Sequence, residues 1–222
     1  MCVSAVVLAA GRGRRMGAEG NKVYLRLGEK TVLGHTLESL SACRRIDEIV
    51  LVVARSEHGE AREASGGLRV PVRYVNGGAR RRDSAMAGIL AAQGELVLIH
   101  DGARPFVDVS LIDRVIDAAG VHGAAVPTVP EVDSLRHASG DTLHPDVIDR
   151  QGLLKMQTPQ GFSRDLLLQT LAEVEADLPD DAAAILAAGH PVRWVTGSPL
   201  NIKLTRPEDL ALGEAILSLH RP

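Results

Sequence analysis

Three glycines and three arginines are interspersed in a short segment that follows an apolar run. The run Val3–Leu8 is rich in β-branched residues and predicts a buried strand, and the segment Ala9–Gly17 after it has the sequence AAGRGRRMG. Glycines let backbone N–H groups approach a phosphate, and arginines add charge-assisted donors. Ligands of an open parallel sheet bind at the carboxyl ends of its strands. The segment therefore predicts a polyphosphate-binding loop.

Two other phosphate-binding loops match this segment poorly. A Walker loop requires a lysine that follows its second glycine, but Met16 stands at the glycine position and the next lysine is Lys22. A dinucleotide loop also requires a glycine at position 16, and an acidic residue about 20 positions further on. Arg55 ends the next apolar run instead, and no YxxxK pair is present. An NADPH-dependent dehydrogenase is therefore a weaker alternative.

Apolar runs alternate with segments of helical spacing. Strands are predicted at Val3–Leu8, Ile49–Val53, Val70–Val75 and Leu96–Ile99. Helices are predicted at Thr31–Ala42, Arg81–Ala92, Ser110–Ala119, Arg164–Glu175, Asp181–Ala188 and Pro207–Leu219. This order predicts an α/β fold with three layers, in which a mostly parallel, doubly wound, Rossmann-like sheet lies between helices. We expect one domain over residues 1–222, with a projecting β-hairpin arm at about 129–150, where polar residues surround Ser139-Gly140-Asp141.

The composition excludes several classes of protein. The formal net charge of −3 argues against a nucleic-acid partner, because nucleic-acid-binding domains carry a basic excess. No apolar run approaches the 18 residues that a membrane span requires, so we expect no membrane partner. The two cysteines form no disulfide framework and no zinc motif, which fits a cytoplasmic location.

Four ordered segments resemble one known family. They are Ala5–Leu27, which contains the glycine loop, and HDGARP at 100–105, QTPQGF at 157–162 and NIKLTRPEDL at 201–210. Their order and spacing are similar to those of the cytidylyltransferases that act on 2-C-methyl-D-erythritol 4-phosphate. The resemblance implies transfer of a cytidylyl group from CTP to that acceptor, giving 4-diphosphocytidyl-2-C-methyl-D-erythritol and pyrophosphate.

The resemblance also implies roles for individual residues. Catalysis is assigned to Arg15, Lys22, Arg150 and Lys203, of which Arg15 and Lys22 would stabilise the transition state. With the glycine loop included, nucleotide binding is assigned to Ala9, Ala10, Gly11, Gly13, Arg15, Lys22, Gly78, Ser84, Asp101 and Lys203. Acceptor binding is assigned to Arg104, Ser134, Arg150, Thr158 and Asp180. Because Ser134 and Arg150 lie in the arm, the resemblance implies a homodimer in which each arm contacts the neighbour's substrate.

The cofactor implied is Mg²⁺ or another divalent cation. Mg²⁺ keeps waters and substrate phosphates as ligands and uses one or two carboxylates at most, so no direct protein cage is expected. Asp101 is the candidate carboxylate.

Some residues depart from the family pattern. Asn21 replaces a proline before Lys22, Val23 replaces a glutamine, and Ala79 replaces an acidic residue. Asp180 stands where the family usually has a threonine, and its carboxylate would repel an acceptor phosphate. Either its side chain turns away, or the segment shifts, or the acceptor site differs. Transfer to another polyol phosphate such as ribitol 5-phosphate, and nucleotide sensing without catalysis, remain alternatives.

Overall fold

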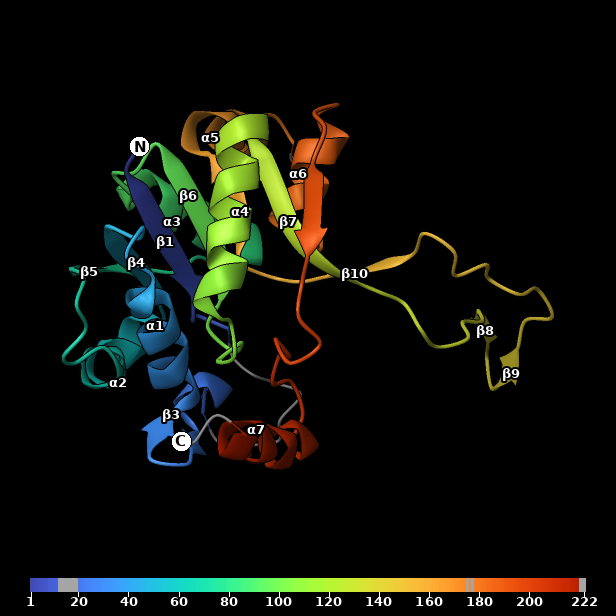
Figure 1. Cartoon of the computed structure of the whole chain (residues 1–222), viewed down its shortest axis with the longest axis horizontal. Helices are drawn as coiled ribbons and strands as arrows, with labels where there is room; N and C mark the ends of the chain where they lie inside the picture. Colours follow the sequence, from blue (N-terminus) through green and yellow to red (C-terminus); the bar gives the residue numbers. More distant parts are fainter. Residues whose placement is uncertain (12–19, 175, 177, 220–222) are drawn as a thin grey trace.

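A mixed, mostly parallel sheet forms the centre of the molecule and lies between two layers of helices (Figure 1). The computed structural model describes residues 1–11, 20–174, 176 and 178–219. Neighbouring strands follow the order β10-β7-β11-β6-β1-β4-β5, and β12 pairs with β7. The predicted three-layer α/β fold is therefore confirmed.

The elements have the following bounds. The sheet consists of β1 (Val3–Leu8), β4 (Glu48–Val53), β5 (Val72–Asn76), β6 (Leu96–Asp101), β7 (Ala124–Pro130), β10 (Leu154–Met156), β11 (Gln160–Ser163) and β12 (Arg193–Thr196). The α-helices are α1 (Val32–Ala42), α2 (His58–Ala64), α3 (Arg81–Ala91), α4 (Val109–His122), α5 (Arg164–Glu173), α6 (Asp181–Ala187) and α7 (Glu208–Leu219). Short elements are η1 (Lys22–Tyr24), η2 (Arg55–Glu57), and the strand pairs β2 (Arg26–Leu27) with β3 (Lys30–Thr31) and β8 (Ala138–Ser139) with β9 (Thr142–Leu143).

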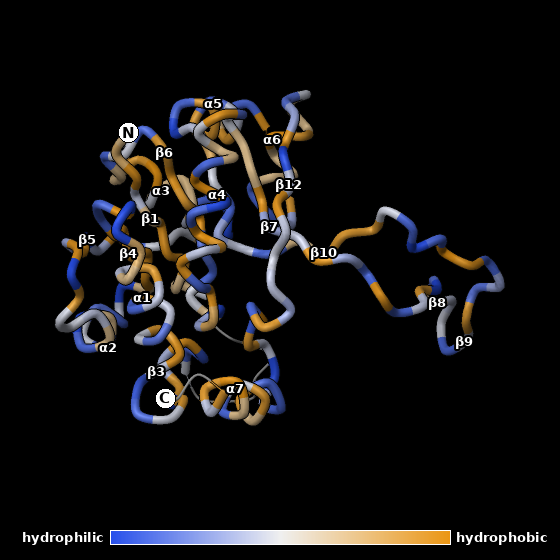
Figure 2. Tube along the Cα trace, viewed as in Figure 1, coloured by the Kyte–Doolittle hydropathy of each residue, from blue (hydrophilic) through white to orange (hydrophobic). Residues whose placement is uncertain are grey.

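The sheet carries apolar side chains on both faces, which is why its strands read as continuous hydrophobic runs. In β1, Val7 faces the layer formed by α1, α2 and α4, whereas Val6 faces the layer formed by α3, α5 and α6. Figure 2 shows the same distribution, with hydrophobic residues along the sheet and hydrophilic residues in the loops. Burial on both faces holds β5, β4, β1 and β6 in a parallel array whose carboxyl ends lie at one edge.

All six predicted helices are present, with ends that differ by a few residues. Local capping explains several of their starts. Thr31 precedes α1 and its hydroxyl accepts a hydrogen bond from Gly34 N at 3.0 Å, and Asp108 caps α4 through Leu111 N at 2.7 Å. Helix α2 was not predicted, because it is short and buries only Ala61.

Four strands of the sheet were also not predicted, namely β7, β10, β11 and β12. The most important is β11, which inserts antiparallel between β6 and β7. Its sequence, Gln160-Gly161-Phe162-Ser163, lacks an apolar run, although Phe162 is fully buried. Gly161 fits because a Cβ there would lie 2.8 Å from a methyl carbon of Val115.

The predicted arm extends far from the body of the molecule (Figure 1). It leaves the sheet at the end of β7 and returns at β10, so its base lies a few residues beyond the predicted bound at position 150. The hairpin β8–β9 turns at Gly140, which has a φ of 64°, as the turn signal predicted.

Helix α7 packs beneath the carboxyl edge of the sheet, against the N-terminal hairpin β2–β3. Leu27 and Leu204 are buried in this contact, and Leu217 packs against them. Segments near both ends of the chain therefore meet at the edge where the glycine loop begins. Among the residues that the structure describes, no helix is long and apolar enough to cross a membrane.

Candidate active site

Strand register places the first predicted motif beside the second. Leu8 at the end of β1 pairs with Asp101 at the end of β6 and with Val52 in β4. Two backbone hydrogen bonds continue the pairing beyond the strands, from Ala9 N to Val52 O at 2.8 Å and from Gly102 N to Leu8 O at 3.0 Å. The start of the glycine loop is therefore fixed against Asp101.

A cleft of about 800 Å³ opens at this edge of the sheet. Every residue predicted to bind the nucleotide and described by the structure lines it: Ala9, Ala10, Gly11, Lys22, Gly78, Ser84, Asp101 and Lys203. Gly13 and Arg15, like the arginines on either side of Gly13, lie outside the described residues. Other residues that line the cleft include Asn21, Arg80, Arg81 and Thr205.

Lys22 reaches the cleft from the short helix η1, and Asn21 anchors that helix. The Asn21 side chain accepts a hydrogen bond from Val23 N and donates to Ala9 O at 2.5 Å and to Glu57 Oε2 at 3.0 Å. Lys22 Nζ in turn donates to Leu204 O at 2.6 Å. An asparagine in place of the family's proline thus ties the Lys22 turn to the end of β1.

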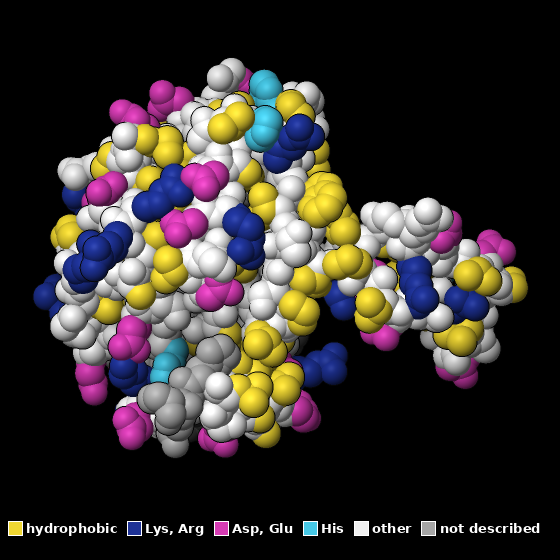
Figure 3. Space-filling model, viewed as in Figure 1, with side chains coloured by type: hydrophobic (Ala, Val, Ile, Leu, Met, Phe, Trp, Pro, Cys, Tyr) yellow, Lys and Arg dark blue, Asp and Glu magenta, His cyan; other side chains and the backbone are white. Residues whose placement is uncertain are grey.

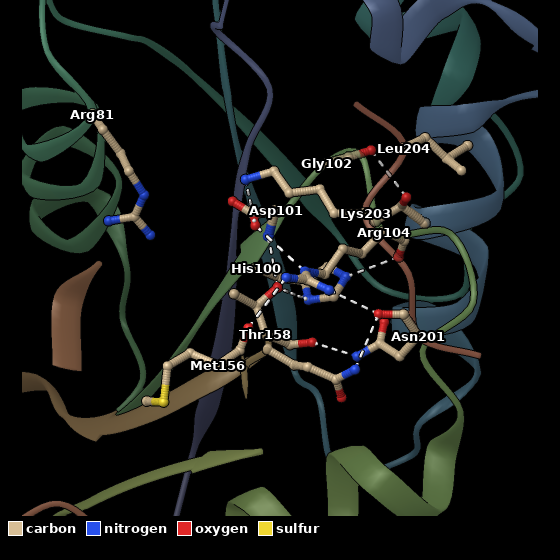
Figure 4. A network of polar contacts seen from close by, with 12 residues as sticks. Arg81, His100, Asp101, Gly102, Arg104, Met156, Thr158, Asn201, Lys203 and Leu204 are labelled. Carbon is tan, nitrogen blue, oxygen red and sulfur yellow. Dashed lines mark hydrogen bonds and ion pairs between the residues drawn. The ribbon is translucent and has the colours of Figure 1, made fainter. Parts of the chain in front are cut away.

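Asp101 is the centre of the charged part of the cleft. Its carboxylate lies 2.8 Å from Lys203 Nζ and 3.5 Å from Arg104 Nε (Figure 4). Burial by itself would raise the pKa of Asp101, but Lys203, then Arg104 and Arg81, outweigh it and lower the pKa to about 2. Asp101 is therefore ionised at neutral pH, and it holds the Lys203 ammonium in place.

A buried hydrogen-bond network supports Asp101 from below (Figure 4). The Thr158 hydroxyl accepts from Asp101 N at 3.1 Å and lies 3.0 Å from His100 Nδ1. His100 Nε2 lies 3.1 Å from Arg104 O, and a carbonyl only accepts. Nε2 therefore carries the proton, and the Thr158 hydroxyl donates to Nδ1. Asn201 completes the network by donating to Thr158 O at 2.8 Å.

His100 is the central residue of this network. It is fully buried, and burial lowers its pKa from 6.5 to about 4. The ring is neutral at pH 7, which the donor and acceptor pattern also requires. It connects Arg104 and Thr158, which are both predicted acceptor residues.

The paired glycines before α3 are required by close contacts. A Cβ on Gly77 would lie 2.4 Å from Ala10 Cβ, and one on Gly78 would lie 2.3 Å from Asp83 Cβ. Gly78 N donates to the Ser84 hydroxyl at 3.1 Å, and that hydroxyl donates to Arg80 O at 3.2 Å. This turn therefore packs directly on the start of the glycine loop and forms one wall of the cleft.

Comparison with known proteins gives a consistent family. The family model described as 2-C-methyl-D-erythritol 4-phosphate cytidylyltransferase matches residues 3–219. This chain belongs to that family. The family's members are cytidylyltransferases, a class of nucleotidyltransferase, so membership favours this hypothesis over the dehydrogenase alternative.

Individual proteins that are similar in sequence carry names of the same family. The enzyme of that name from Geobacillus thermodenitrificans is 39% identical, with 98% of each chain covered. A bifunctional enzyme IspD/IspF from a Chelativorans strain is also 39% identical over 96% of this chain, but this chain spans only 54% of that protein's length. This chain thus spans about half the length of the bifunctional relatives that it matches.

Solved structures of the family share the fold. The 4-diphosphocytidyl-2C-methyl-D-erythritol synthase from Anaerococcus prevotii has a TM-score of 0.85 at 30% identity, with 98% of this chain and 96% of that chain covered. The 2-C-methyl-D-erythritol 4-phosphate cytidylyltransferase from Thermus thermophilus has a TM-score of 0.81 at 34% identity, with 96% and 98% covered.

None of the residues that the family resemblance assigns to the acceptor is among the described residues that line this cleft. Thr158 is 4% exposed and belongs to the supporting network, and Arg104 donates to Asn201 O at 2.8 Å. Ser134 and Arg150 lie on the arm, where the Arg150 guanidinium donates to Val132 O. Their roles in acceptor binding stay predictions.

Asp180 has a local partner in this structure. It is the N-cap of α6, and its Oδ1 accepts a hydrogen bond from Ala183 N at 2.8 Å. A carboxylate at a helix N-terminus is stabilised by the helix dipole. This contact gives the carboxylate a partner within its own helix, and the role of Asp180 toward an acceptor stays a prediction.

Proposed function

We propose that this chain transfers a cytidylyl group from CTP to 2-C-methyl-D-erythritol 4-phosphate, giving 4-diphosphocytidyl-2-C-methyl-D-erythritol and pyrophosphate. The observation that carries the proposal is the shared location of the eight described nucleotide-binding candidates in one cleft, in a chain of the cytidylyltransferase family. We also infer that residues 1–222 act as one nucleotidyltransferase domain with the arm as its projection.

The reaction is an in-line displacement at phosphorus. A phosphate oxygen of the acceptor attacks the α-phosphorus of CTP, and a new O–P bond forms opposite the bond to the β-phosphate. That bond breaks, and pyrophosphate leaves with its electron pair. The attacking oxygen is already an anion at pH 7, so no general base is required. The site must supply positive charge and alignment.

The lysines of the cleft are placed to supply both. Lys22 and, by the resemblance, Arg15 neutralise the charge that develops on the oxygens of the α-phosphorus. Lys203 orients the reacting groups, and its ion pair with Asp101 fixes where its ammonium stands. Lys22 and Lys203 both line the cleft although they come from opposite ends of the chain.

The cleft fits a divalent cation held mainly by substrate. Asp101 is the only carboxylate among the described residues that line it, and no described group of three or more His, Cys, Asp or Glu side chains resembles a metal cage. One carboxylate with substrate phosphates and water is the coordination that Mg²⁺ favours. The cation would neutralise triphosphate charge, and Asp101 would be its protein contact.

We further propose a homodimer in which the arms complete the neighbouring sites. Arg150 and Ser134 are exposed on an arm that points away from the body (Figure 1). The arm also exposes the hydrophobic residues Val132, Leu143 and Val147. Figure 3 shows hydrophobic side chains on the arm and where it meets the body. Exposed apolar surface of this kind is typical of an interface.

The test is pyrophosphate release from CTP and Mg²⁺ with each acceptor. We expect turnover with 2-C-methyl-D-erythritol 4-phosphate and much slower turnover with ribitol 5-phosphate. The reverse preference would show that ribitol 5-phosphate is the acceptor. CTP binding without turnover with either acceptor would indicate a nucleotide sensor.

Substitution of Lys22 tests the mechanism. We expect Lys22→Gln to lower kcat about 100-fold while most CTP affinity remains, because its charge acts mainly on the transition state. Lys30→Gln, which removes an exposed lysine paired with Glu38, is the matched control and should leave kcat unchanged. Equal rates for the two variants would contradict the role of Lys22.

A further inference from the structure

Three consecutive arginines open helix α3, and tertiary structure gives each a different environment. Arg80 is the N-cap of the helix, and its Nη2 lies 2.8 Å from Asp83 Oδ1 in the first turn. The Arg82 guanidinium donates to the carbonyl of Leu171 in α5. Arg80 and Arg81 both line the cleft, and Arg81 Nη2 lies 2.7 Å from Asp181 Oδ2.

The Arg81–Asp181 contact is a largely buried ion pair between α3 and α6. The Asp181 side chain is 2% exposed and the Arg81 side chain is 29% exposed. A buried ion pair of this kind is a poor source of stability, since two apolar side chains of similar volume would pack as well at lower desolvation cost. What the pair does provide is a cation with a fixed orientation at the cleft wall.

Arg81 has more donors than its bond to Asp181 uses. A guanidinium has five N–H groups, and the bond to Asp181 uses one of them. Figure 4 shows the Arg81 side chain extending from α3 toward the side of the site where Asp101 and Lys203 lie. All three residues line the same cleft. A ligand in the cleft would have Arg81 on one side and Lys203 on the other.

The carboxylates near Arg81 keep its guanidinium charged. Burial lowers the pKa of Arg81, but Asp181, Asp101 and Asp180 outweigh it and raise the pKa, so the side chain is cationic throughout the physiological range. The same three carboxylates would repel a phosphate if Arg81 were absent. Arg81 offsets part of this negative charge at the cleft wall, as Lys203 and Arg104 do at Asp101.

We propose that Arg81, oriented by Asp181, is a phosphate-binding residue of the cleft. A planar guanidinium matches phosphate oxygens with parallel N–H donors, which a lysine cannot do. The inference rests on the proposed function, in which both substrates carry phosphate. The phosphate belongs either to the triphosphate or to the acceptor, and separate binding measurements distinguish these sources.

The experiment compares Arg81→Gln with Arg82→Gln, a matched neighbour outside the cleft. Affinities for CTP and for 2-C-methyl-D-erythritol 4-phosphate are measured by calorimetry, with KM and kcat alongside. We expect Arg81→Gln to lower the affinity for one of the two substrates by about 10- to 100-fold, as for a lost hydrogen bond to a charged group. Weaker CTP binding would show that Arg81 contacts the triphosphate. Weaker acceptor binding would show that Arg81 contacts the acceptor's monophosphate. Arg82→Gln should leave both affinities unchanged.

A double variant separates ligand binding from a purely structural role. Arg81→Gln alone leaves Asp181 buried without its counter-ion, so the midpoint temperature of thermal unfolding should fall. Adding Asp181→Asn restores a neutral hydrogen-bonded pair, and the midpoint temperature should return toward that of the wild type. We expect the substrate affinity to stay weak in the double variant, because the cation is still missing.

Two results would overturn the inference. One is an unchanged affinity for both substrates in Arg81→Gln, and the other is recovery of affinity together with stability in the double variant. If the wild-type protein turns over both substrates in either case, only the role of Arg81 fails. A wild-type protein that binds neither substrate would refute the proposed function and this inference together.

Discussion

His100 is a neutral residue on which the charged groups of the cleft depend. Its ring accepts from Thr158 and donates to Arg104 O, and Thr158 in turn accepts from the backbone N–H of Asp101. Protonation would place a buried positive charge beside Arg104 and would remove the acceptor that Thr158 uses. The network therefore requires the neutral ring that burial favours.

This requirement predicts a dependence of stability on pH. The pKa of His100 is 6.5 ordinarily and about 4 in the folded protein. Between these values the unfolded chain binds the additional proton, so the free energy of unfolding falls as pH decreases. Stability is unaffected by this group above pH 6.5, and about 3 kcal/mol of it is lost by pH 4.

Urea unfolding between pH 4 and 8 measures this slope in wild type and in His100→Gln. We expect a flatter slope in the variant. Asp101 acts in the same direction but at lower pH, because its folded pKa is about 2 and its ordinary value is 3.8. Identical slopes for the two proteins above pH 4 would rule out His100 as the source.

At the scale of elements, the cleft is formed by turns that pack on one another at the strand ends. Gly77 closes the turn after β5 and contacts Ala10, which begins the glycine loop after β1. Helix η1 is tied to the same place through Asn21 and Ala9. These contacts join turns that the parallel sheet brings together at its carboxyl edge. The distances between the backbones of these turns therefore determine the shape of the cleft.

Gly77→Ala tests this packing. The new Cβ would approach Ala10 Cβ to 2.4 Å, so one turn must move. We expect the free energy of unfolding to fall by about 1–3 kcal/mol and kcat/KM to fall about 10- to 100-fold. The control is Gly59→Ala in α2, where a Cβ meets nothing within 4 Å and alanine favours the helix. A fully active Gly77→Ala protein would show that the turn does not shape the site.

At the scale of the whole molecule, the arm separates two predicted acceptor residues from the cleft of their own chain. Ser134 and Arg150 belong to the arm, and none of the described residues that line the cleft does. A closed dimer with twofold symmetry would place each arm on the neighbouring body. Under this proposal every active site contains Lys22 from one subunit and Arg150 from the other.

Mixing two inactive variants tests shared sites. In a heterodimer of Lys22→Ala and Arg150→Ala, one site has both substitutions and the other has neither. Equal amounts that exchange subunits should therefore recover about a quarter of wild-type activity. Sedimentation of each variant would verify that the dimer persists. Mixed samples that stay inactive after exchange would place both residues in the same subunit's site.

Much of this organisation follows from local sequence. The continuous apolar runs Val3–Leu8 and Leu96–Ile99 predict buried parallel strands, and helix caps such as Thr31 and Asp108 fix several helix starts. Because parallel strands end at one edge, the start of the glycine loop lies beside Asp101, as the register of Leu8 with Asp101 shows. These features depend on interactions within a few residues or on the general geometry of sheets.

Other features depend on partners that local pattern does not encode. Strand β11 has a polar sequence, and it is a strand because β6 and β7 provide hydrogen bonds on both sides. Three adjacent arginines look equivalent in sequence, but Arg81 alone meets Asp181, which lies 100 positions away. The sequence by itself determined the layers and the edge that carries the site. Tertiary structure decided which charges face the cleft, because that choice depends on contacts between segments far apart in the chain.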